Sequence, residues 1–79
     1  MRKDWKEIMT NKAEFIEALQ STLWVDERSD LDSISYEVNL ETREEYIYVF
    51  FNGGTSKRIL ATANSNYANA KAILEAVYG

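Results

Sequence analysis

The chain of 79 residues contains no cysteine, no histidine and no proline. Without cysteine there is no disulfide, no thiolate nucleophile and no zinc–thiolate site. Without histidine there is no imidazole base, no Ser-His-Asp triad and no iron site with two histidines and one carboxylate. A domain this small has little room to bury a tuned site built from carboxylates, Lys, Tyr and Ser alone. We therefore expect a protein that is not an enzyme and that uses no cofactor and no metal.

Long apolar runs are also absent. No window approaches the roughly 18 apolar residues of a membrane span, and no apolar run follows Arg2 and Lys3 as it would in a secretory signal. We expect a cytoplasmic protein that makes no membrane contact. The apolar fraction of 46% is that of a globular chain, and the length fits a single domain over residues 1–79. A core of this size rarely supplies more than about 3–5 kcal/mol, so self-association belongs among the hypotheses.

The spacing of apolar residues predicts one helix at each end of the chain. Phe15, Leu19 and Leu23 recur at helical spacing and predict a helix over about residues 11–23, after a short turn or extended segment over 4–9. We expect this break because Lys12 interrupts the apolar series, and a single continuous helix is the alternative. A polar loop should follow over residues 24–32. The last helix is expected from about Ser65 to residue 78, with a C-terminal glycine cap.

Between the helices the sequence predicts three strands. Apolar and polar residues alternate strictly over 34–40, residues 45–51 favour β-structure almost throughout, and a third strand fits 56–62. Residues 41–44 form the first turn, and Asn52-Gly53-Gly54 is the signal of a tight hairpin rather than of a phosphate loop. The predicted fold class is α+β: a three-stranded antiparallel β-meander flanked by N- and C-terminal helices (αβββα), with both helices mainly on one face.

The register of the first hairpin decides which side chains face outward. Closing it around Thr42-Arg43 places Leu40 opposite Glu45, and opposed residues share a face. The face assigned to the core then holds Ile34, Tyr36, Val38, Leu40, Ile47, Val49, Phe51 and Leu60. The opposite face holds Ser35, Glu37, Asn39, Tyr46, Tyr48, Phe50, Lys57, Ile59 and Ala61. A slip of one residue would exchange the two faces.

Three aromatic rings in a row are the first candidate for function. Tyr46, Tyr48 and Phe50 alternate along the middle strand, next to Ile59. They form either an exposed platform for a protein partner or a second copy of the chain, or a covered layer. Stacking of single-stranded nucleic-acid bases is a further hypothesis. The net charge of −4 and the absence of the glycine–aromatic motif of RNA-binding domains disfavour it.

In the covered alternative, the N-terminal segment folds over the rings. Its apolar residues are Trp5, Ile8 and Met9. The rings would then belong to a second small core and would not be a contact surface.

Acidic residues are concentrated in the middle of the chain. Residues 26–45 hold eight acids against two bases, a net charge of −6. Such a segment is either a solvated edge that resists strand aggregation, or a negative surface for a basic groove, in the extreme case one that imitates a nucleic-acid backbone. The carboxylates of residues 26–32 lack the spacing of an EF-hand loop, so we expect no metal there.

No motif in the chain identifies a family. In shape and composition the chain looks like many phage or prophage accessory proteins, some of which inhibit nucleic-acid-handling enzymes of the host; the resemblance covers no motif, so no residue role follows from it. The leading hypothesis is a small acidic protein-interaction module, an inhibitor of this type that docks on a basic, nucleic-acid-binding surface of a partner protein. The alternatives are a homodimer joined through the aromatic sheet face and a single-stranded nucleic-acid binder. The candidate partner-binding residues are Asp30, Asp32, Glu37, Glu41, Glu44, Glu45, Tyr46, Tyr48, Phe50 and Ile59.

Overall fold

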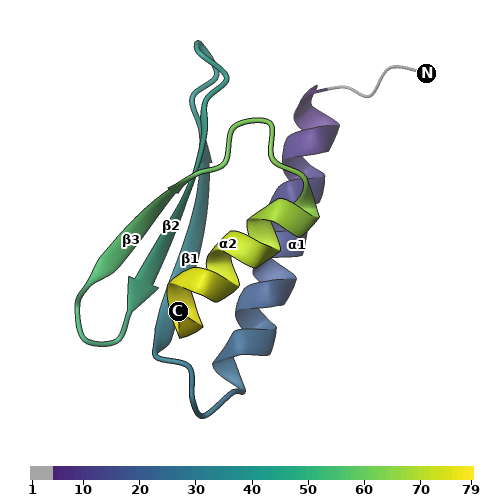
Figure 1. Ribbon diagram of the computed structural model, residues 1–79. Helices are drawn as coiled ribbons and strands as arrows, with labels where there is room; N and C mark the ends of the chain where they lie inside the picture. The colour runs from purple at the N-terminus through teal and green to yellow at the C-terminus, as the bar shows by residue number, and fades with distance from the viewer. Residues whose placement is uncertain (1–4) are drawn as a thin grey trace.

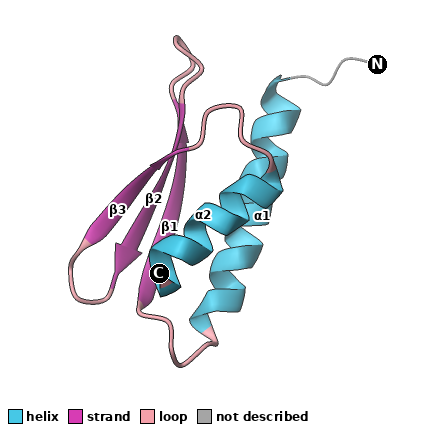
Figure 2. Ribbon diagram, viewed as in Figure 1, coloured by secondary structure: helices cyan, strands magenta, loops and turns pink. Residues whose placement is uncertain are grey.

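The computed structural model describes residues 5–79 and contains the predicted order of elements. Two helices flank a three-stranded antiparallel sheet with strand order β1-β2-β3 (Figures 1 and 2). The elements are α1 (Trp5–Trp24), β1 (Leu31–Val38), β2 (Glu45–Phe51), β3 (Ser56–Leu60) and α2 (Asn66–Tyr78). The α+β meander with helices at both ends is therefore confirmed. No helix within residues 5–79 is long and apolar enough to cross a membrane.

Helix α1 is continuous from Trp5 to Trp24, so the expected break before residue 11 is wrong and the alternative of one long helix is correct. The break was expected because Lys12 interrupts the apolar series. The structure shows why Lys12 is tolerated there: its ammonium group lies 2.6 Å from the carboxylate of Glu45 on β2. A cation that finds a buried anion can occupy the inner face of a helix.

The β1–β2 pairing keeps the predicted parity but shifts by two residues. Val38, not Leu40, lies opposite Glu45, and Tyr36 lies opposite Ile47. The reason is local. The side-chain oxygen of Asn39 accepts the N–H groups of residues 41 and 42, and its own N–H donates to the carbonyl of residue 44. A six-residue loop over 39–44 results, and Leu40 lies exposed in it rather than in the core.

A β-bulge lies near the start of β1. The register shifts between Leu31 and Ser33, so Leu31 pairs with Phe51 while Ser33 pairs with Phe50. The extra residue turns Leu31 back toward the core, where it is buried. This bulge explains why the strand begins at residue 31, three residues before the alternation that is visible in the sequence.

The β2–β3 pairing gives β3 the opposite parity from the one that the predicted faces require. Tyr46 pairs with Leu60, and Ile47 pairs with Ile59. The loop over 52–55 sets this register: the N–H of Phe51 donates to the carbonyl of Thr55, and Gly54, with φ of 91°, turns the chain. A slip of one residue moves every side chain of a strand to the other face. The predicted faces of Lys57, Ile59, Leu60 and Ala61 are therefore all wrong.

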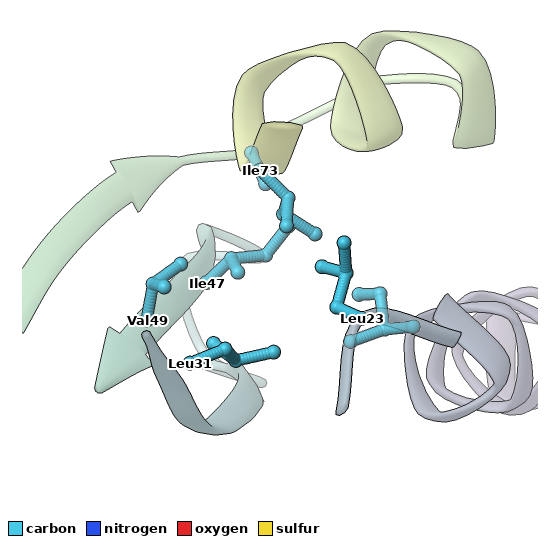
Figure 3. Packing of buried hydrophobic residues seen from close by; sticks show 7 residues of the cluster. Leu23, Leu31, Ile47, Val49 and Ile73 are labelled. Carbon is cyan, nitrogen blue, oxygen red and sulfur yellow. The ribbon is translucent and has the colours of Figure 1, made fainter. Parts of the chain in front are cut away.

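The core lies between the sheet and the two helices. Ile47 and Val49 of β2 are completely buried and point toward Leu23 of α1 and Ile73 of α2 (Figure 3). Both helices pack on this face. Because successive side chains of a strand point to opposite faces, those of Tyr46, Tyr48 and Phe50 point to the other side of the sheet. Helix α2 begins as predicted: the Ser65 hydroxyl accepts the N–H of residue 68, which is an N-cap bond.

Candidate functional site

The aromatic face is formed by Tyr46, Tyr48 and Phe50 on the side of β2 that lies opposite the helices. The ring centroids of Tyr46 and Tyr48 are 6.5 Å apart, and those of Tyr48 and Phe50 are 6.4 Å apart. The last two rings are nearly parallel, with an interplanar angle of 17°. Tyr46 and Tyr48 are half-buried, and 38% of Phe50 is exposed. The parity predicted for the middle strand therefore holds, and its rings line an open sheet face.

The neighbours of the rings come from both outer strands. On β1, Glu37 lies opposite Tyr46; on β3, Leu60 lies opposite Tyr46 and Arg58 opposite Tyr48. The guanidinium carbon of Arg58 is 5.3 Å from the centroid of the Tyr46 ring, a cation–π contact. Leu60 is 64% exposed and extends the apolar surface beyond the rings.

Ile59 does not belong to this surface, which corrects the sequence prediction. It lies opposite Ile47 and packs against the core. Leu60, which was assigned to the core, takes its place beside the rings. The observed β2–β3 register accounts for both changes, because successive side chains of a strand point to opposite faces.

The alternative in which the N-terminal segment covers the rings is not supported for Ile8 and Met9. Met9 lies near Tyr36 and Val38, whose side chains point to the core face of the sheet. Ile8 lies near Lys12 and Asn66, between the two helices. Residues 1–4 and the side chain of Trp5 lie outside the described part of the chain.

Glu45 is not a surface residue, which corrects a second prediction. Only 1% of it is exposed. Its carboxylate accepts hydrogen bonds from the Lys12 ammonium group (2.6 Å), the Tyr36 hydroxyl (2.5 Å) and the backbone N–H of Ala63 (3.0 Å). A buried carboxylate with three donors ties together α1, β1, β2 and the loop that precedes α2. Glu45 therefore stabilises the fold and is not available to a partner.

The electrostatics of this cluster follow from its contacts. Burial would raise the pKa of Glu45, but the hydrogen bonds from Lys12, Tyr36 and Ala63 favour the anion and hold the pKa below its ordinary value. Burial and the bond to the Glu45 carboxylate both raise the pKa of Tyr36. Near neutral pH Tyr36 thus stays protonated beside an ionised Glu45, a pairing that suits a structural network better than an acid–base catalyst.

The remaining candidate acids lie in a line and do not form a cluster. Asp30 and Asp32 are exposed at the start of β1, Glu37 is exposed near its end, and Glu41 is exposed in the loop that follows. Of these four acids, only Glu37 is placed beside the rings by the strand register, opposite Tyr46. Glu44 is half-buried, and the Tyr46 hydroxyl donates to its carboxylate, which lowers the pKa of Glu44.

Several residues of the site escaped sequence reasoning. Lys12 and Tyr36 were treated as a helix interruption and an apolar core residue, but both bond to Glu45. The only signal in the sequence was the charge of Lys12 inside an apolar series, and its partner is 33 residues away.

Asn69 is completely buried, and its amide has no hydrogen-bond partner among the described residues.

Comparisons with protein-family models, with curated proteins and with solved structures return no match, so this chain's own residues are the basis for any functional proposal.

Proposed function

We propose that this chain is a protein-binding module that performs no chemistry of its own, with the aromatic face at the centre of its contact surface. The observation that carries the proposal is the row of three rings on a sheet face that neither helix covers. Tyr and Phe are enriched in the buried centres of protein interfaces, where a large rigid ring supplies contact area at little entropic cost. Leu60, exposed beside the rings, adds to the same surface.

The size of the sheet sets how far the contact must extend. Seven residues of strand span about 24 Å, and three strands span about 14 Å, so the face covers roughly 340 Å². A stable interface of standard size uses about 800 Å² per partner. The rings therefore supply the centre of the contact, and the surrounding charged residues supply its border.

The border indicates the chemistry of the partner. On the β1 side it carries the exposed carboxylate of Glu37, with exposed Asp32 at the start of that strand and exposed Glu41 in the loop after it, while Arg58 lies across the rings on β3. Residues 26–45 as a whole have a net charge of −6. We propose a partner protein with an apolar patch next to a basic surface, such as one that holds nucleic acid, which this chain would block as phage-type inhibitors do. Electrostatic attraction would speed the encounter and make it sensitive to salt.

A second copy of the chain fits this surface less well. Face-to-face pairing of two sheets would bury about 340 Å² of each copy, so the rest of a homodimer interface, which runs above about 2,000 Å² in total, would have to come from the border. Each copy would also bring a border rich in carboxylates toward an equally acidic neighbour. The test must therefore distinguish self-association from the binding of a partner protein.

The test uses the unchanged chain and two tyrosine variants as baits in a cell lysate, and then measures the binding of each one to the purified partner. Tyr48→Glu places a charge in the middle of the rings, while Tyr67→Glu makes the same change at an exposed position on α2. We expect Tyr48→Glu to weaken binding about 100-fold, as for a central interface residue, and Tyr67→Glu to change it less than about threefold. Raising the salt from about 50 to about 500 mM should also weaken binding, because it screens the acidic border.

Three results would overturn the proposal. The first is a partner that binds both variants equally well. The second is a stable dimer in light scattering that Tyr48→Glu dissociates, which would assign the rings to self-association. The third is quenching of tyrosine fluorescence by short single-stranded oligonucleotides at low salt, which would assign them to base stacking.

A further inference from the structure

The two edges of the sheet are protected differently. Strand β3 is only five residues long and carries Lys57 and Arg58, a combination that discourages pairing with another strand. Strand β1 lies beside α1, and two α1 side chains bond to its outer backbone groups. Gln20 accepts the N–H of Ile34 at 2.6 Å, and the indole N–H of Trp24 donates to the carbonyl of Asp32 at 2.8 Å. These side chains occupy the positions where a neighbouring strand would bond.

This protection stops after Ile34. In an antiparallel pair the backbone groups of alternate residues point away from the partner strand. Because the N–H of Ile34 points outward, those of Tyr36 and Val38 do so as well. The α1 residues that line the hollow beside them are Ala13, whose side chain has no polar group, and Thr10, whose hydroxyl is turned to its own helix and donates to the carbonyl of residue 6.

A groove separates the two elements at this point. One hollow of about 310 Å³ is lined by Met9, Thr10, Ala13, Tyr36, Val38 and Leu40. A second hollow, of about 350 Å³, continues from it along α1 and shares Ala13 and Tyr36 with it. We call this surface the β1 groove. The walls of the first hollow are mainly apolar side chains, whereas Glu17, Gln20 and Ser35 give the second hollow polar walls as well.

We propose that the β1 groove binds an extended peptide segment of a partner, which adds as a fourth strand along Tyr36 and Val38. An extended chain can pair with both outward N–H and C=O groups of these residues, which the side of a helix cannot do. Apolar side chains on alternate positions of the peptide would enter the hollows. Glu17 lines the end near Ile34, so a Lys or Arg at that end of the peptide fits. This site is distinct from the aromatic face, so either can fail without the other.

The experiment selects binders from random peptides of about 12 residues displayed on phage, with the full chain as bait. We expect an enriched consensus of alternating apolar residues with a base at one end. A synthetic peptide of that consensus, added to isotope-labelled protein, should slow amide exchange at Tyr36 and Val38 at least about tenfold, because their N–H groups gain partners. The amides of Ser35 and Glu37, which point toward β2, should already exchange slowly in the free protein.

Two pairs of variants test the geometry. Val38→Pro removes the outward N–H at an edge position that tolerates proline, whereas Val38→Ile keeps it. We expect the first to weaken peptide binding at least about tenfold and the second less than about threefold, the difference reflecting a lost backbone bond at a desolvated edge. Ala13→Trp fills the position shared by the two hollows, and Ala18→Trp makes the same change at an exposed position of α1. Ala13→Trp should block peptide binding, and Ala18→Trp should not. If Val38→Pro does not fold, this second pair of variants tests whether the peptide occupies the groove.

The proposal is overturned if no peptide is enriched over an uncoated surface. It is also overturned if the enriched peptides bind Val38→Pro and Ala13→Trp as well as the unchanged chain. Peptides that lose binding to Tyr48→Glu but not to the groove variants would occupy the aromatic face, which supports the proposed function and contradicts the strand-addition site.

Discussion

The Lys12 ammonium group donates a hydrogen bond to the Glu45 carboxylate, with 2.6 Å between Nζ and Oε1. This buried ion pair joins the middle of α1 to the first residue of β2. Removing one member of a buried ion pair costs about 3–5 kcal/mol, because the other charge remains buried without its partner. The whole stability of a chain this short is of similar size. One side chain therefore decides whether the fold persists.

Lys12→Met should unfold a large part of the population at 25 °C. The Tyr36 and Ala63 donors remain on Glu45, so we expect the loss to lie near the lower end of that range, about 3 kcal/mol. Circular dichroism with urea titration measures it, and Lys71→Met, at an exposed position of α2, is the matched control. A loss below about 1 kcal/mol would mean that the pair contributes little to stability.

The low pKa of Glu45 predicts a specific acid dependence. A carboxyl group whose pKa is lower in the folded state stabilises the fold above its unfolded pKa, here near 4.5, and loses that contribution as the pH falls through the folded value. The stability of the unchanged chain should therefore fall more steeply below about pH 4.5 than that of Glu45→Gln. Urea midpoints at a series of pH values from neutral to about 3 measure the difference. Parallel curves for the two proteins would contradict the assignment.

The β2–β3 loop offers a test of backbone conformation. Gly54 has φ of 91°, and a Cβ at this position would meet no atom within 4 Å, so Gly54→Ala changes only the backbone energy. We expect a loss of about 1–2 kcal/mol. Gly53 is equally open but is not among the residues with positive φ, so Gly53→Ala should have little effect. Equal thermal shifts for the two variants would show that the turn has another conformation.

The buried amide of Asn69 predicts a stabilising substitution. It has no hydrogen-bond partner among the described residues, and an unsatisfied buried polar group costs about 1–3 kcal/mol. Asn69→Leu removes that penalty with a side chain of similar size. We expect the free energy of unfolding to rise by about 1 kcal/mol, measured by urea titration. A fall of the same size would show that the Asn69 amide makes a polar contact that the chain needs.

The sequence predicted the elements well where the signal is local. The bounds of β2 match the observed strand, and α2 differs from its prediction by one residue at the N-terminus because Ser65 serves as the cap. The outward parity of Tyr46 and Tyr48 also holds. Alternation within β2 places these rings on one face, and the shift of two residues in the β1–β2 register leaves the choice of face unchanged.

What could not be predicted depends on contacts between distant segments. The face on which Ile59 lies depends on the β2–β3 register set by the 52–55 loop, and this register exchanges Ile59 and Leu60 relative to the predicted faces. Glu45 looked like a surface acid because its donors Lys12 and Ala63 lie 33 and 18 residues away. Nothing in the local pattern distinguishes a carboxylate that finds buried donors from one that faces water.

The placement of both helices behind the sheet has a practical consequence. The C-terminal residue, Gly79, follows directly from α2, on the helical side of the molecule (Figure 1). A biosensor surface or a fused carrier protein attached there would contact the helical side of the molecule. Tyr46, Tyr48 and Phe50 would then face the solution. Surface-immobilised chain can therefore be screened for ligands of its ring-bearing side without blocking the surface under study.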